Sequence, residues 1–320
     1  MKKMPEAVVH ASFGQEVLSS LAPEIRDAVV DVPYRFALFG PDVWFMYQPW
    51  LRREGRGRRM HTTLTGEFLN ALIRRARTSA CRPEMFSYLA GFLCHYALDS
   101  ITHPYIIYVT TQEHCFPRSH MNMEHALDIQ QMRRDGVWGE SHPVTGHYYP
   151  HIRLPECMES DLNEVFASVY GWPGCRKDLN RSFLLYRHCY RLLENPRGFA
   201  SRLARLTGIR VLKSLAYSES AFLSLDAENL EHRIWKHPFD PSLSFSDSFP
   251  ELREKALRLA VSLIESVWRY LWLGEGTEES LAALIGSNSY LSGLPADDPR
   301  NRSVPSLMPP GDEPEKERLC

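Results

Sequence analysis

His95, Asp99 and His103 are spaced four residues apart in the stretch HYALDSITH. Residues at positions i, i+4 and i+8 of an α-helix lie along one face, drifting by about 40° per step. The flanking residues are largely apolar, which predicts that this helix is packed on most of its sides. Two imidazoles and a carboxylate on a buried helix are unfavourable unless they are paired or bind a metal ion. The spacing therefore indicates that these three side chains either pair with one another inside the protein or bind a metal ion.

A second pair with the same spacing, His120 and Glu124, follows in the stretch HMNME. An imidazole nitrogen and a carboxylate oxygen one helical turn apart can reach a single cation, and both are ligands that zinc favours. With 13 histidines in the chain, one such pair also arises by chance and is ordinarily an ion pair on a helix surface. Five donors on two successive segments favour a site for more than one metal ion.

Three residues of ligand type lie upstream: His10, Asp42 in the turn sequence FGPD, and His61 after an arginine-rich stretch. Each also has an ordinary interpretation. His10 could be a surface residue, Asp42 a turn former and His61 the first residue of a helix. Spacing alone does not select these three residues.

The elements that must position these side chains are predicted to be helices, because apolar residues recur at helical spacing and period-two alternation is scarce. The helix that carries His95 is predicted over residues 84–102, after Pro83 and ending before Pro104. Helices over residues 61–78 and 119–134 would carry His61 and His120, with Ser119 as an N-cap. Further helices are expected over residues 13–21, 156–170, 181–193, 198–228 and 250–273.

The composition limits the possible classes of protein. The 320 residues are 44% hydrophobic, enough for a substantial core, and the net charge of −2 gives no general attraction to nucleic acid or anionic membranes. The seven cysteines are scattered without a C-x-x-C pair, which argues against a disulfide framework and against a cysteine zinc site, and suits a reducing compartment. We see no signal peptide and no apolar stretch of about 18 residues, so a soluble cytoplasmic protein is expected.

The order of these motifs resembles the zinc-dependent phospholipase C family. The motifs are His10, Gly40-Pro41-Asp42, Met60-His61, the Leu89–Asp99 stretch, His103-Pro104 and His120–Glu124. That family shares an all-helical fold and a trinuclear zinc site with the single-strand-specific fungal nucleases. The likeness covers roughly residues 4–135 and is most specific over residues 91–103. A later segment, from Trp235 to Leu252, resembles the bacterial branch of the family.

The resemblance implies a set of metal ligands. A first zinc would be held by Asp42, His61, His95 and Asp99, and a second by His103, His120 and Glu124. A third would use His10, with Asp99 as a bridging carboxylate. Two features depart from the family: no tryptophan precedes His10, and His103 follows Asp99 more closely than in the secreted enzymes. Two zinc ions are therefore well provided for, whereas the third lacks its usual N-terminal ligand.

The resemblance also implies an activity, the hydrolysis of phosphodiester bonds by a metal-bound hydroxide that attacks phosphorus in line. Asp42 is the candidate general base. Phospholipid is the leading substrate, other phosphodiesters are compatible, and the protein could contact a membrane peripherally. Stable binding of nucleic acid is not expected. Two alternatives stay open: a nuclease or nucleotidase of the same superfamily, and a helical scaffold or binding protein with reduced catalysis.

The stretch from residue 44 to residue 59 combines aromatic and basic side chains. Its candidates for substrate binding are Arg56, Arg58, Arg59, Trp44 and Tyr47. The ordinary interpretations are a solvated charged loop for the arginines and core packing for the aromatic residues.

For the whole chain, we expect one helical domain over residues 1–291, with the ligands in residues 4–135 and helices over residues 156–290 completing it. Residues 292–320 are expected to form a disordered tail.

Overall fold

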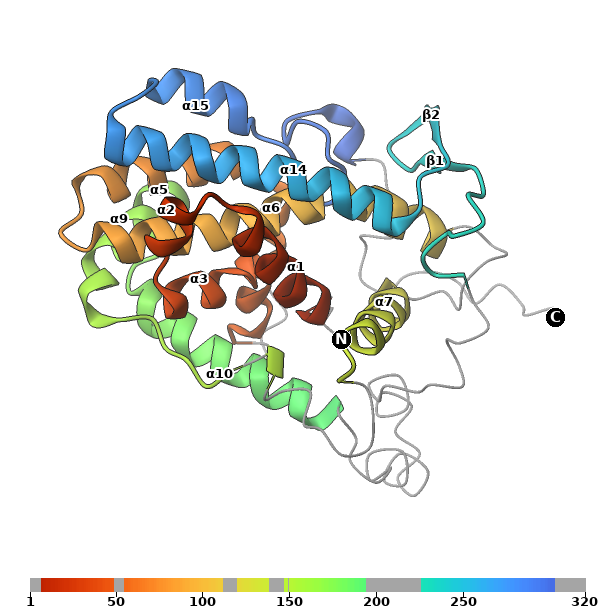
Figure 1. Cartoon of the computed structure of the whole chain (residues 1–320), viewed down its shortest axis with the longest axis horizontal. Coiled ribbons are helices and arrows are strands. Elements are labelled where there is room, and N and C mark those ends of the chain that lie inside the picture. The colour runs from red at the N-terminus through yellow and green to blue at the C-terminus, as the bar shows by residue number, and fades with distance from the viewer. Residues whose placement is uncertain are drawn as a thin grey trace.

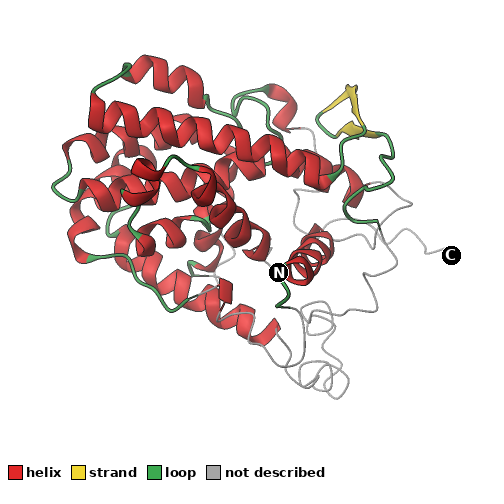
Figure 2. Cartoon of the chain, in the orientation of Figure 1, coloured by secondary structure: helices red, strands yellow, loops and turns green. Residues whose placement is uncertain are grey.

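Helices make up nearly all of the regular structure in the computed structural model, which describes residues 7–48, 55–111, 120–137, 147–148, 150–193 and 226–302 (Figures 1 and 2). The N-terminal elements are α1 (Ala7–Ser20), α2 (Pro23–Asp27), α3 (Asp31–Ala37), the 3-10 helix η1 (Gly40–Met46), α4 (Arg56–Thr62) and α5 (Thr65–Thr78). The middle elements are α6 (Arg82–Thr111), α7 (His120–Arg134), η2 (Glu156–Met158), α9 (Glu159–Tyr170) and α10 (Cys175–Leu193). The C-terminal elements are β1 (Trp235–His237), β2 (Asp240–Phe245), α14 (Phe249–Trp268), the π-helical turn η4 (Arg269–Leu273), α15 (Glu278–Ile285) and η5 (Pro299–Arg302).

The predicted all-α class is confirmed, and the two strands form only a short antiparallel hairpin. None of the helices in the described ranges is both long enough and apolar enough to cross a lipid bilayer. The apolar side chains gather into one main core to which almost every helix contributes. The fold therefore places its polar site inside a helical body.

α6 is the central element of this body, and its residues from Met85 to Ser100 are all buried. Helices α3, α5 and α14 pack along it, and α14 runs beside it over much of its length (Figure 1). Gly91 makes the contact with α3 close, since a Cβ at this position would lie 2.3 Å from the carbonyl oxygen of Tyr34. Gly91 of the Leu89-Ala90-Gly91 motif, one turn before His95, thus allows α6 to pack closely against α3.

The predicted end of this helix before Pro104 is wrong, because α6 continues through the proline to Thr111. A proline lacks an N–H, so the carbonyl of Ser100 loses its usual partner in the helix. Gly293 lies directly against this carbonyl. A Cβ on Gly293 would be 2.4 Å from the oxygen of Ser100, and its φ of +65° also favours glycine. A distant segment therefore covers the backbone group that the proline leaves unpaired.

The helix predicted over residues 61–78 is two helices. Thr63 is extended and Leu64 has a φ of 59°, so α4 ends at Thr62 and α5 begins at Thr65. His61 therefore lies in the last turn of α4, not at the start of a helix.

The helices predicted over residues 13–21, 156–170, 181–193 and 250–273 are confirmed, with shifted ends. The helix over 119–134 is confirmed from His120, and most of the one over 198–228 lies outside the described residues.

Residues after α15 fold back over α6. The hydroxyl of Tyr96 donates to the carbonyl of Ile285 at 2.8 Å and accepts from the N–H of Asn288 at 3.3 Å. Ser292 is fully buried, and residues 292–302 form turns and η5. The disordered tail predicted from residue 292 therefore does not begin there, because polar side chains such as Asn301 bond the local backbone. Residues 303–320 lie outside the described part of the chain.

Asp128 of α7 caps the first turn of α1. One of its carboxylate oxygens accepts from the backbone N–H groups of Val8 and Val9 at 3.1 and 3.0 Å. The first N–H groups of a helix have no partner within the helix and carry partial positive charge, so a buried carboxylate there is stabilising. Asp128 also lies one turn after Glu124, which fixes α1 relative to the face of α7 that carries His120 and Glu124.

Replacing Asp128 by alanine should therefore destabilise the protein. We expect Asp128→Ala to lower the free energy of unfolding by about 2 kcal/mol, because it leaves buried N–H groups without an acceptor. Urea denaturation would measure the change. The exposed Glu254, whose one ion pair among the described residues is with Arg258 on the same helix, is a matched control, and Glu254→Ala should change stability by less than about 0.5 kcal/mol. Equal effects would contradict the cap.

Candidate metal centre

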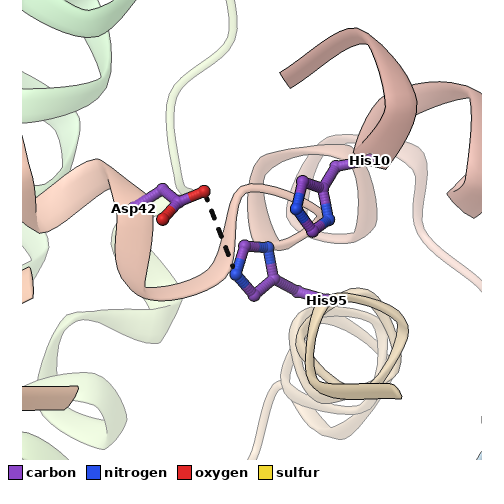
Figure 3. Close-up of side chains that lie close together, drawn as sticks. All are labelled: His10, Asp42 and His95. Atoms are coloured by element: carbon purple, nitrogen blue, oxygen red, sulfur yellow. Dashed lines mark ion pairs between the residues drawn. The ribbon is translucent and has the colours of Figure 1, made fainter. Parts of the chain in front are cut away.

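His10, Asp42 and His95 meet from three separate elements, α1, η1 and α6 (Figure 3). The rings of His10 and His95 stack with centroids 4.0 Å apart and planes 13° apart. The Oδ2 of Asp42 lies 3.9 Å from the Nε2 of His95. One ligand atom from each of the three residues lies within 4.8 Å of the others. Residues far apart in the sequence thus form one donor group.

Asp99 and His61 complete this group. Asp99 Oδ2 lies 3.0 Å from the Nε2 of His95, and Asp99 Oδ1 lies 3.1 Å from the Nε2 of His10. The Nε2 of His61 lies 3.1 Å from Asp42 Oδ1 and 3.8 Å from Asp99 Oδ2. Asp99 is therefore the residue around which the histidines converge.

His103, His120 and Glu124 form a second donor group beside the first. Glu124 Oε1 lies 2.7 Å from His120 Nε2 and 3.8 Å from His103 Nε2, and the two imidazole rings stack. Asp99 Oδ2 lies 3.5 Å from His103 Nδ1 and so connects the two groups. The structure thus brings together all eight residues that the sequence suggested as ligands.

Backbone carbonyls orient three of the imidazoles. The Nδ1 of His61 lies 2.7 Å from the carbonyl oxygen of Gly57, and that of His95 lies 3.0 Å from the oxygen of Leu38. The Nδ1 of His103 lies 2.9 Å from the oxygen of Tyr290. A carbonyl only accepts, so in each case Nδ1 carries the proton and donates it. The Nε2 lone pairs are then left for metal coordination, as in most histidine metal sites.

Gly40 lets the η1 turn approach His95. Its φ is +41°, and a Cβ at this position would lie 2.5 Å from the imidazole ring. A larger residue would therefore push either the ring or the turn that carries Asp42 out of place. The glycine of the Gly40-Pro41-Asp42 motif therefore allows Asp42 and His95 to lie close together.

The charge and hydrogen bonding of the cluster fit bound cations. Asp42, Asp99 and Glu124 are at most 2% exposed. Within the described ranges, all their ion-pair partners are histidines. In the same part of the chain, both oxygens of Asp42, one oxygen each of Asp99 and Glu124, and the Nε2 of His95 have no hydrogen-bond partner. Buried carboxylates need compensation, and nitrogen and oxygen donors at this spacing suit zinc.

Without metal, the centre behaves as a network of ion pairs. Burial lowers the pKa of His103, but the charges of Asp99 and Glu124 raise it more, to about 9. Burial raises the pKa of Glu124, but the neighbouring His120 and His103 lower it to about 2. The pKa of His10 is lowered, chiefly by burial and by the adjacent His95. A cation that binds His103 must therefore displace a proton.

Tyr290, which sequence analysis did not identify, closes the centre from the C-terminal segment. Its ring lies 5.5 Å from that of His61 and 5.9 Å from that of His95, between centroids. Its N–H donates to the carbonyl of His61 at 3.2 Å, and its own carbonyl accepts from His103. A backbone carbonyl can come from any residue type, so no sequence signal pointed to this position.

The predicted substrate-binding side chains are arranged differently. Trp44 is fully buried, which agrees with the core interpretation. The guanidinium of Arg56 lies 3.8 Å from the ring centroid of Tyr47, 4.8 Å from that of Trp44, and 3.2 Å from Asp178. These contacts fasten α4 to η1 and α10, and a substrate role for Arg56 stays a prediction. Arg59 is exposed beside Tyr170 and Trp172, and a substrate role for Arg58 and Arg59 stays a prediction.

The central place of Asp99 predicts an unequal effect of two conservative substitutions. Asp99→Asn should lose more than one zinc per chain, because its carboxylate faces both donor groups. Glu124→Gln should lose at most one, because within the described ranges its carboxylate forms ion pairs with His103 and His120 of the second group alone. Elemental analysis of protein purified without chelator would measure both. Equal losses would argue against the bridging position of Asp99.

The raised pKa of His103 predicts proton release on zinc binding. Because this pKa is about 9, His103 is protonated at pH 7 in the metal-free protein and must become neutral to bind zinc. We expect about one proton from this residue at pH 7, falling to about half a proton near pH 9. Calorimetry in buffers of different ionisation enthalpy would count the protons. His103→Gln should release about one proton fewer, and an unchanged count would contradict the assignment.

Comparison with known proteins agrees with this geometry. The family model described as zinc dependent phospholipase C matches residues 9–173, which is 165 of the 320 residues. All eight candidate ligands lie inside the matched region. No curated protein and no solved structure gave a match. With its candidate ligands converging as described and more than half of its length matched, the chain belongs to the zinc-dependent phospholipase C family.

Proposed function

We propose that this protein is a zinc-dependent hydrolase that cleaves the phosphodiester bond of phospholipids. The observation that carries the proposal is the convergence of eight donors from α1, η1, α4, α6 and α7, seven of them buried and His120 partly buried, several without a hydrogen-bond partner among the described residues. Membership of the family supports a hydrolase of the phospholipase C class. Two zinc ions are proposed, in the Asp42–His61–His95–Asp99 group and the His103–His120–Glu124 group. His10 and Asp99 provide part of a third position.

Bound zinc would act as a Lewis acid toward the phosphoryl oxygens and favour ionisation of the attacking water. Asp42 can assist this water as a general base, because neither of its oxygens is taken by a hydrogen bond from the described residues. Asp99 and Glu124 keep the histidines in place and balance the cationic charge. Attack in line with the departing alkoxide is the proposed course of the reaction.

The exposed fractions of the ligands suggest the side from which a substrate approaches. The side chain of His120 is 12% exposed and that of His103 is 7% exposed. Those of His95, Asp42 and Asp99 are at most 3% exposed. A phosphate group would therefore reach the centre from the His103–His120 side. The deeper donors would hold metal and would not touch the organic part of the substrate.

Hydrolysis of phosphatidylcholine vesicles would test the proposal directly. The expected products are diacylglycerol and the phosphorylated headgroup, with loss of activity on chelation and recovery with zinc. Asp99→Asn should lower kcat/KM by at least about 100-fold through loss of metal, whereas the exposed Glu254→Gln should have no effect. Asp42→Asn should lower kcat more than zinc content if Asp42 is the general base, and parallel losses would leave it as a ligand only.

The same assay separates the alternatives. Cleavage of a single-stranded oligonucleotide but not of lipid would favour a nuclease of the same superfamily. Full zinc content with no turnover of lipid, nucleotide or a chromogenic phosphodiester would favour a scaffold or binding protein. Fewer than two zinc ions per chain would contradict the multinuclear centre itself. The cytoplasmic location and the peripheral membrane contact stay predictions.

A further inference from the structure

Two cysteines that are 76 residues apart in the sequence lie together at the start of α6. Cys81 immediately precedes the helix, Glu84 lies in its first turn, and Cys157 lies in η2. One ligand atom from each lies within 4.8 Å of the other two. The thiol of Cys81 also donates to the backbone oxygen of Cys157 at 3.3 Å. None of these residues takes part in the histidine centre.

We propose that Cys81, Glu84 and Cys157 form a second, separate site for a zinc-class divalent cation. Two thiolates and one carboxylate are a donor set that such a soft ion accepts, with a water molecule as the fourth ligand, and that calcium and magnesium do not prefer. Sulfur–zinc bonds of about 2.3 Å in tetrahedral geometry place the two sulfur atoms roughly 3.7 Å apart. Side-chain movements of about 1 Å would therefore close the three donors around an ion.

The charges around this cluster also favour a cation. Glu84 makes no ion pair within the part of the chain that the structure describes. Asp161 places a further carboxylate oxygen 3.4 Å from the sulfur of Cys81, although Arg75 balances its charge. Cys157 is exposed, so an ion can reach the site from solvent. The position is thus accessible and partly negative before either thiol loses its proton.

A metal ion suits this cluster better than a disulfide does. Burial raises the pKa of Cys81 to about 12, and the neighbouring Cys157 and Asp161 add to the effect. Little thiolate is therefore available at neutral pH for attack on a disulfide or peroxide. A bound cation removes this obstacle, because it stabilises the thiolate directly and displaces the proton. In the described residues Cys81 and Cys157 are both free thiols.

The proposed ion lies far from the reaction centre. Cys81 and His95 are separated by 14 residues, which corresponds to roughly 21 Å along α6. The ion would therefore not contact a phosphate held by the histidines. It would fasten η2, and with it the start of α9, to the base of the helix that carries three of the ligands. Its role is to hold these elements together.

Cobalt provides a signal that is specific to this site. The full chain would be produced in zinc-depleted, cobalt-supplemented medium, and its near-ultraviolet thiolate-to-cobalt charge-transfer band recorded. The described donors of the histidine centre are nitrogen and oxygen only, so within the described part of the chain this band would report the cysteine site. We expect the band in the unmodified chain, its loss in Cys157→Ser, and its retention in Cys189→Ser. Cys157 is exposed and its replacement should not disturb folding, and Cys189 is a free thiol outside the cluster.

Zinc analysis supplies the second measurement. Cys157→Ser should bind one zinc fewer than the unmodified chain and keep the hydrolytic activity of the histidine centre. Glu84→Gln should keep the cobalt band and weaken metal affinity at least tenfold. Absence of the band in the unmodified chain, or its survival in Cys157→Ser, would overturn the proposal. So would a Cys81–Cys157 disulfide that peptide mass spectrometry finds in zinc-loaded protein.

Discussion

The carboxylate of Asp99 is the point on which the arrangement of this protein depends. It lies within 3.8 Å of nitrogen atoms from four histidines: 3.0 Å from His95, 3.1 Å from His10, 3.5 Å from His103 and 3.8 Å from His61. A buried negative charge is tolerated only where positive or polarisable groups surround it. The helices that supply these imidazoles must therefore meet at Asp99, and the packing around α6 serves this requirement.

Main-chain atoms give the centre its rigidity. The carbonyls of Leu38, Gly57 and Tyr290 each fix the ring of one histidine, and they belong to the end of α3, to α4 and to the segment after α15. Each carbonyl is held in turn by the element that contains it. The position of an imidazole then follows from backbone packing more than from its own rotamer, which is how metal sites obtain reproducible geometry.

The helical part of this design could be predicted from the sequence, because it is local. The spacing of His95, Asp99 and His103 depends only on helical periodicity, and the apolar flanks of these residues indicate burial. His10 and His61 could be selected only by resemblance, because their meeting with Asp99 results from tertiary packing. The continuation of α6 through Pro104 was not predictable, since Gly293 covers the freed carbonyl from a segment distant in sequence. The cysteine cluster was missed because Cys81 and Cys157 share no local motif.

The contribution of Tyr290 has a consequence for how the protein is made. The centre contains contacts between His61 and Ser289 and between His103 and Tyr290, which are 228 and 187 residues apart in the sequence. A chain emerging from a ribosome contains all eight candidate ligands long before it contains this segment. Until the segment arrives, His103 lacks the acceptor that directs its ring, and the ligands form an incomplete set. Ordering of the two donor groups would therefore wait until the chain has been synthesised through Tyr290.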